Sequence, residues 1–141
     1  MPLHQTDALL TIAAAEFDRF VEFYRCLLSQ EPSKWIPNSY AEFQLPGLRL
    51  GIFRPKIQNS FQVSGSVSTI AAPSKRDPSQ PMHLPIQGMS LCLEVVDLKV
   101  AIAHLTALGY PPPGDIITAS HGREIYAFDP GGNWLILHES A

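Results

Sequence analysis

A chain of 141 residues is long enough for one domain with a hydrophobic core and too short for two large domains. Its net charge of −3 offers no basic surface to a phosphate backbone, so we expect no nucleic-acid partner. The longest apolar run, residues 8–15, is too short to span a bilayer, so we expect no membrane partner.

The first half of the chain predicts a strand, a helix and three further strands. Residues 8–14 form a short strand-like run. Apolar residues then recur at helical spacing over 17–28, which places one apolar stripe on a helix that should end just before Pro32. Alternating apolar runs predict the next strands at residues 35–36, 40–45 and 48–53.

The second half repeats this order. A strand is predicted at residues 89–95, and a helix over 98–108 carries the next apolar stripe. Asp97 is placed to cap this helix at its N-terminus, and Gly109 to close it at its C-terminus. The three strands that follow are predicted at residues 115–118, 123–128 and 133–138.

The two helical stripes superimpose when the first is shifted by 81 residues, which brings Phe17 onto Leu98 and Tyr24 onto Leu105. This repeat predicts an α+β fold with two βαβββ modules, residues 7–54 and 88–140, in a single domain. Residues 55–87, rich in Ser, Pro and Gln, are predicted to link the modules, with a short strand or flap at residues 61–63. An unrelated α+β domain with two helices is the alternative.

The segment from Gly122 to Trp134 resembles the closing hairpin of the vicinal oxygen chelate superfamily, which includes glyoxalases, bleomycin resistance proteins and extradiol dioxygenases. In that hairpin an aromatic strand precedes Asp-Pro-x-Gly-Asn and a final strand; here the turn is Asp129-Pro130-Gly131-Gly132-Asn133. The helix segment 18–24 and the segment 94–98 are similar to other motifs of the superfamily. We interpret the turn residues as scaffold, because Asp129 can accept turn hydrogen bonds and the two glycines permit positive φ.

The resemblance implies that the modules form curled mixed sheets around a cavity, with any metal held by the first and last strands of each module. Those positions fall on four residues that cannot form a metal site: Leu9, Gly51, Ser90 and Ile136. We therefore predict no cofactor. A divalent metal held by His4, His83 and His138 is the less favoured alternative, while His104 and His121 are expected to face solvent.

Alternation along the last strand places Trp134, Ile136 and His138 on one face, which the resemblance assigns to the cavity. The corresponding set in the first module is Arg49, Gly51 and Phe53. With Ser90, these residues predict a pocket for a small aromatic or carbonyl-bearing molecule, or one with an anionic group. The alternative is that Trp134 and Phe53 are packed core residues.

Three functions remain open from the sequence. The favoured one is a metal-free protein that binds a small molecule in the inter-module cavity. The second is a metal-dependent dioxygenase, glyoxalase-like lyase or epimerase, and the third is a structural domain with a filled cavity. Dimers are common in the superfamily and curled sheets have exposed edges, so we expect a homodimer.

Cellular location is inferred from two features. Residues 1–7 lack the basic region of a secretory signal peptide. Cys26 and Cys92 fall within a predicted helix and a predicted strand, where we expect buried thiols that form no disulfide. Such thiols fit a reducing compartment, and we expect the cytoplasm.

Overall fold

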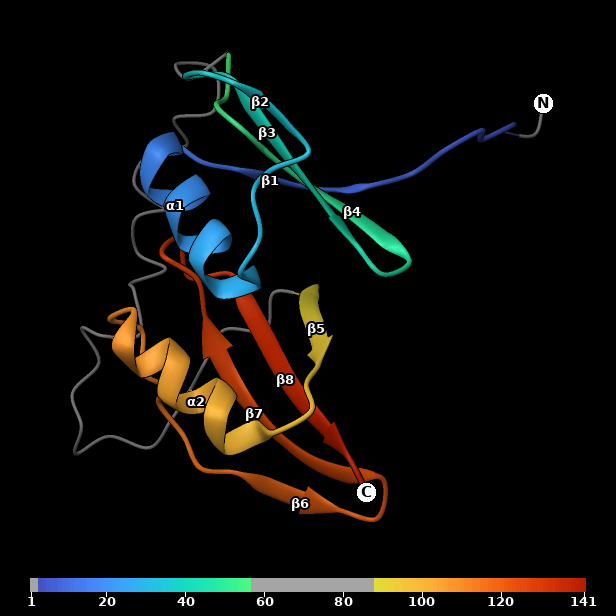
Figure 1. Cartoon of the computed structure of the whole chain (residues 1–141). Coiled ribbons are helices and arrows are strands. Elements are labelled where there is room, and N and C mark those ends of the chain that lie inside the picture. The colour runs from blue at the N-terminus through green and yellow to red at the C-terminus, as the bar shows by residue number, and fades with distance from the viewer. Residues whose placement is uncertain (1–2, 57–87) are drawn as a thin grey trace. The chain divides into compact units, whose positions relative to one another are not determined.

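The computed structural model describes residues 3–56 and 88–141, and Figure 1 shows the whole chain. The chain divides into two compact units, Met1–Asn59 and Ser60–Ala141. The strand or flap expected at residues 61–63 lies outside the described residues. No helix in the described ranges combines the length and apolar character needed to cross a membrane.

The first unit is a four-stranded mixed sheet with one helix. Its sheet has the order β1-β4-β3-β2, in which β1 runs parallel to β4 and the other pairs are antiparallel. The elements in chain order are β1 (Leu10–Ala13), α1 (Phe17–Leu28), β2 (Lys34–Ile36), β3 (Tyr40–Leu45) and β4 (Leu48–Phe53).

Helix α1 buries its apolar stripe in a core shared with β3 and β4. Phe17 and Tyr24 are almost fully buried, as are Phe43, Leu50 and Ile52 on the strands. The helix ends because the next residue, Ser29, takes the left-handed conformation with φ of 53°, and its N–H bonds back to the last turn. The predicted strands β3 and β4 have their predicted bounds.

The second unit repeats the arrangement, with sheet order β5-β8-β7-β6 and β5 parallel to β8. Its core contains Leu98 and Leu105 from the helix together with Leu135 and Leu137 from β8. The elements are β5 (Ser90–Glu94), α2 (Leu98–Ala107), β6 (Ile117–Ala119), β7 (Gly122–Phe128) and β8 (Trp134–Ser140).

Both ends of α2 form as expected. The Val100 N–H donates to the Asp97 carboxylate at 3.2 Å, and Gly109 adopts a φ of 96° just past the helix. A long-range contact adds to this cap, because the Leu98 N–H donates to the Glu139 carboxylate at 2.8 Å. Phe17 and Leu98, the pair matched by the 81-residue shift, are the first residues of the two helices.

The turn between β7 and β8 confirms the scaffold interpretation. Asp129 is 3% exposed, and its carboxylate accepts the N–H groups of Gly131 and Asn133, both at 2.9 Å. The Asn133 side chain donates to the second carboxylate oxygen at 2.8 Å. Of the two glycines, Gly132 takes the positive φ, 83°. The turn thus satisfies a buried carboxylate locally.

Two expectations about burial were wrong. Cys26 is half-buried and Cys92 is exposed, although neither forms a disulfide. Cys92 is exposed because side chains alternate along β5, and its neighbour Leu91 takes the buried side. His104 is half-buried on α2, whereas His121 is exposed as expected.

The α+β fold class and the strand, helix, three-strand order of both modules are confirmed, with a four-stranded mixed sheet in each unit. The strand bounds differ by two residues at most, because β1 and β6 begin two residues later than predicted and β8 ends two residues later.

Candidate functional site

Each sheet has one side packed on the helix of its own unit. The opposite side is called here the helix-free face. In the second unit Leu135 and Leu137 are fully buried on the helix side of β8, so Trp134, Ile136 and His138 lie on the helix-free face. The prediction that these three share a face is confirmed, and all three are half-buried.

An aromatic cluster forms part of the helix-free face of the second unit. The Trp134 ring meets Tyr126 edge-on at a centroid distance of 5.2 Å and Phe128 at 5.6 Å. Ser90 pairs with Trp134 in the parallel register and is exposed. The Trp134 indole nitrogen is buried and has no hydrogen-bond partner among the described residues. This is unusual, because buried polar groups are normally hydrogen-bonded, and it leaves the indole N–H as a donor that a ligand could use.

His138 is the centre of a polar chain on the same face. Its Nδ1 bonds to the Glu94 carboxylate, and its Nε2 lies 3.0 Å from Nδ1 of His121. The two imidazole rings stack at a centroid distance of 5.1 Å. Because a carboxylate can only accept, the proton of a neutral His138 lies on Nδ1, which leaves Nε2 as an acceptor. The Ser140 hydroxyl also donates to Glu94, at 3.0 Å.

The bond to His138 is the main cause that lowers the pKa of Glu94, and the Ser140 hydroxyl adds to it. The carboxylate therefore stays charged over a wide pH range, and it holds the imidazole in one orientation. This arrangement of carboxylate and imidazole is suited to proton transfer.

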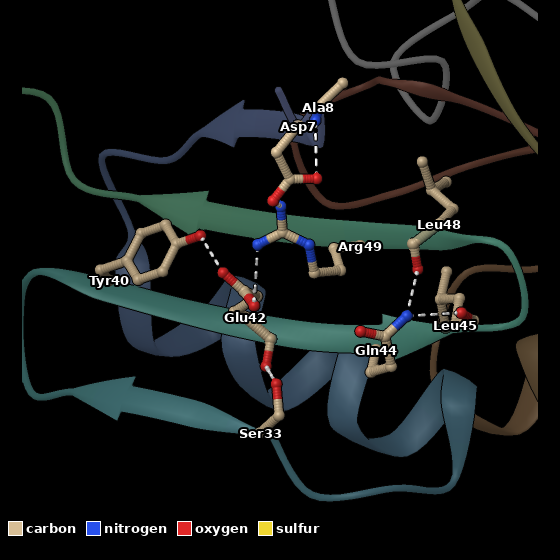
Figure 2. Close-up of polar contacts among 9 residues, drawn as sticks. All are labelled: Asp7, Ala8, Ser33, Tyr40, Glu42, Gln44, Leu45, Leu48 and Arg49. Atoms are coloured by element: carbon tan, nitrogen blue, oxygen red, sulfur yellow. Dashed lines mark hydrogen bonds and ion pairs between the residues drawn. The ribbon is translucent and has the colours of Figure 1, made fainter. Parts of the chain in front are cut away.

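The helix-free face of the first unit has different chemistry, shown in Figure 2. Arg49, Gly51 and Phe53 alternate with the buried Leu50 and Ile52, as their spacing predicted. The antiparallel register of β3 and β4 then adds two side chains, because Tyr40 pairs with Phe53 and Glu42 pairs with Gly51.

Glu42 is the buried carboxylate of this face, 5% exposed. The Tyr40 hydroxyl donates to Glu42 Oε1 at 2.7 Å, and Arg49 Nη1 donates to Oε2 at 3.4 Å. The other terminal nitrogen of Arg49 pairs with Asp7, which precedes β1 (Figure 2). Two carboxylates from separate segments therefore bind one guanidinium.

The pKa values follow from these contacts. The Tyr40 hydroxyl, followed by Arg49, lowers the pKa of Glu42 against the opposing effect of burial. Burial and the bond to Glu42 raise the pKa of Tyr40 to about 12. The Ala8 N–H, followed by Arg49, lowers the pKa of Asp7. Both carboxylates remain charged at neutral pH.

Gly51, one of the four positions at which the resemblance implies metal ligands, has a specific role in packing. A Cβ at this residue would lie 2.7 Å from the Tyr40 hydroxyl oxygen and 3.1 Å from its ring. The phenol ring thus occupies the space that a side chain at residue 51 would take. The absence of a side chain at this position allows Tyr40 to reach Glu42.

The described residues contain no group of three or more His, Cys, Asp or Glu placed to hold a metal ion. Leu9, Gly51, Ser90 and Ile136 supply no set of ligands. The alternative site included His83, which lies outside the described residues. Its other members are His4, which is exposed, and His138, whose two ring nitrogens bond to Glu94 and His121.

Five residues of these two faces were not predicted: Asp7, Tyr40 and Glu42 in the first unit, and Glu94 and His121 in the second. Tyr40 and Glu42 had a usable signal, because the tight turn at residues 46–47 sets the β3–β4 register and therefore their face. Asp7 and Glu94 had none, since their partners lie 42 and 44 residues away in the chain.

Two βαβββ units, each with a mixed four-stranded sheet, define the class of fold found in glyoxalase and bleomycin resistance proteins, and solved structures support this assignment. A glyoxalase / bleomycin resistance protein from Catenulispora acidiphila is 19% identical with a TM-score of 0.59, over 97% of this chain and 100% of that one. The fosfomycin resistance protein FosX from Listeria monocytogenes is 12% identical with a TM-score of 0.64, over 99% and 96%. A lactoylglutathione lyase from Agrobacterium tumefaciens is 18% identical with a TM-score of 0.60, over 96% and 94%.

No protein-family model and no curated protein sequence matches the chain. The fold that the resemblance implies is therefore confirmed, and identities of 12% to 19% show the fold alone.

Proposed function

We propose that this protein binds a small aromatic molecule that carries a carbonyl or anionic group, without a metal ion. The observation that carries the proposal is the buried Trp134 indole N–H, which lacks an acceptor among the described residues. A carbonyl or carboxylate oxygen of a ligand would supply that acceptor. The rings of Tyr126 and Trp134 offer edges and faces for an aromatic group, and Ile136 adds an apolar surface beside them.

Two further findings support this proposal. The four positions at which the resemblance implies metal ligands carry Leu, Gly, Ser and Ile, and the described residues contain no group of three or more His, Cys, Asp or Glu placed to hold a metal ion. Structures of similar fold include proteins named for resistance to bleomycin and to fosfomycin. The cavity expected between the modules stays a prediction.

An NMR titration tests the proposal. Acetophenone is added to labelled protein while the two indole N–H signals are followed, and exposed Trp35 provides the internal control. We expect the Trp134 signal to move downfield and the Trp35 signal to stay in place. A Trp134→Phe variant should lose the rise in melting temperature that the ligand causes, and Trp35→Phe should keep it. No change at Trp134 up to millimolar acetophenone, or one equivalent of bound iron, zinc or manganese, would contradict the proposal.

A second candidate function is metal-independent proton transfer at His138. It is favoured by the Glu94–His138–His121 chain, in which the carboxylate orients His138 and His138 Nε2 accepts the Nδ1–H of the exposed His121. Hydrolysis of 4-nitrophenyl acetate offers a probe, with His121 Nε2 taking a proton from the attacking water as its Nδ1 proton passes to His138. We expect His138→Gln to remove the activity and Glu94→Gln to reduce it. Equal rates for His138→Gln and the wild type would exclude this function.

The homodimer and the cytoplasmic location remain proposals. An edge strand of the first unit, β2, exposes 54% of Trp35 and 57% of Ile36, and an apolar edge of this kind favours association. Light scattering coupled to gel filtration tests the dimer, and Ile36→Lys should shift the mass toward the monomer. A monomeric wild type would contradict the dimer.

A further inference from the structure

We propose that Arg49 binds the carboxylate of an aromatic carboxylate ligand, and that Asp7 occupies that place in the unliganded chain. The inference goes beyond the proposed function, because it describes a separate anion site built within the first unit.

The two partners of Arg49 differ in how firmly they are held. Glu42 is the inner partner: its side chain is 7% exposed, and its other oxygen accepts the Tyr40 hydroxyl. Asp7 is the outer partner: its side chain is 70% exposed, and it lies in residues 3–9, which form no helix or strand. Figure 2 shows the guanidinium between the two carboxylates. Departure of Asp7 would leave the inner pair intact.

The local charge favours a carboxylate in place of Asp7. Lys34 on β2 lies opposite Glu42 in the register of β2 and β3. Its positive charge contributes to the lowered pKa of both Glu42 and Asp7. Without Asp7, the cations Arg49 and Lys34 face one anion, Glu42. An incoming carboxylate would restore neutrality, and it can accept from the guanidinium with the geometry that Asp7 uses now.

The contact made by Asp7 is suited to exchange. The ion pair between Arg49 and Asp7 is screened by water because Asp7 is exposed, so it contributes little to stability. The short segment between Asp7 and β1 nevertheless keeps the Asp7 carboxylate beside Arg49 at a millimolar effective concentration. A simple carboxylate would therefore compete poorly unless it made a second contact. Phe53, half-buried on the same face of β4, can provide that contact to an aromatic ring. An aromatic carboxylate is thus the ligand class that the site fits.

Benzoate is the probe, with benzyl alcohol as the matched compound that lacks the carboxylate. Binding is measured by NMR on the full chain, with the Arg49 Nε–H and the Phe53 backbone signals as reporters. We expect Asp7→Asn to strengthen benzoate binding by up to about fivefold, the range of a weak exposed ion pair, and to leave benzyl alcohol unaffected. Arg49→Gln should abolish the benzoate response. Arg54→Gln is the control, because Arg54 follows β4 directly and bonds to Asn38 instead.

Loss of Arg49 also removes a partner of the buried Glu42 carboxylate. A double variant, Arg49→Gln with Glu42→Gln, is therefore measured as well, because its two uncharged side chains can hydrogen-bond to each other. Equal benzoate affinity in the wild type and Asp7→Asn, or retained binding in both Arg49 variants, would overturn the inference. Benzoate shifts confined to Trp134 and Tyr126 would overturn it too, while the proposed function would stand. The acetophenone titration at Trp134 judges the proposed function separately.

Discussion

The two helix-free faces differ far more than the two cores behind them. Behind the faces, Leu50 and Ile52 of the first unit match Leu135 and Leu137 of the second, and all four are at most 1% exposed. On the faces, the first unit has a carboxylate, a phenol and a guanidinium, whereas the second has an aromatic cluster and two imidazoles. A repeated frame can thus carry two chemistries, because the core restricts the helix side of each strand and not the other.

The largest effects are expected where the two units agree. Leu50→Ala and Leu135→Ala should each lower the free energy of unfolding by about 2–5 kcal/mol, because each leaves a cavity in a fully buried core. Urea denaturation measures both, and Val96→Ala, at a residue 99% exposed, should be near neutral. A loss below about 1 kcal/mol in either unit would mean that its core is not packed as described.

The next effect concerns Gly51, whose missing side chain makes room for Tyr40 on the face of the first unit. Gly51→Ala should cost about 1–3 kcal/mol, because the added Cβ meets the Tyr40 hydroxyl and forces the ring to move. In Tyr40→Phe the closest clashing atom is absent, so the double variant should lose less than the sum of the two single variants. Additive losses in urea denaturation would contradict the contact between these residues.

The helix N-termini offer a smaller contrast. Asp97→Ala should cost about 1 kcal/mol because it removes the cap on Val100 N–H. Glu16 stands at the same place before α1 and makes no side-chain cap within the described part of the chain. Glu16→Ala should therefore change stability by less than about 0.5 kcal/mol. Similar losses in both variants would show that the two helices begin alike.

The smallest effect is the pH dependence that Glu42 and Tyr40 give to the first face. Glu42 has a pKa lowered from 4.5, so its contribution to stability is present above pH 4.5 and is lost as the pH falls through the lower folded value. Tyr40 has a pKa raised from 10.0 to about 12, so its contribution is full below pH 10 and is lost as the pH rises through 12.

Phenolate absorbance and stability profiles measure these two changes. Tyr40 should titrate near pH 12, and Tyr40→Phe should remove that step. Glu42→Gln should remove the acid loss that this residue causes and bring the Tyr40 titration closer to pH 10. If Glu42→Gln left the Tyr40 titration unchanged, the hydrogen bond between them would be disproved.

Local patterns in the sequence were enough to predict the elements, the α+β class and much of one face. Helical spacing, strand alternation, the Asp97 cap and the turn at Asp129 are local, because each depends on residues a few positions apart. Alternation within one strand was enough to group Trp134, Ile136 and His138.

Which charged side chains meet depends on the packing of each whole unit. Arg49 and Asp7 lie 42 residues apart, and His138 and Glu94 lie 44 apart. In each unit the first strand runs parallel to the last, and no hairpin turn connects them to fix the register. A slip of one residue would turn every side chain of that strand to the other side of the sheet. Packing of the whole unit sets the register, and with it the partners of Arg49 and His138.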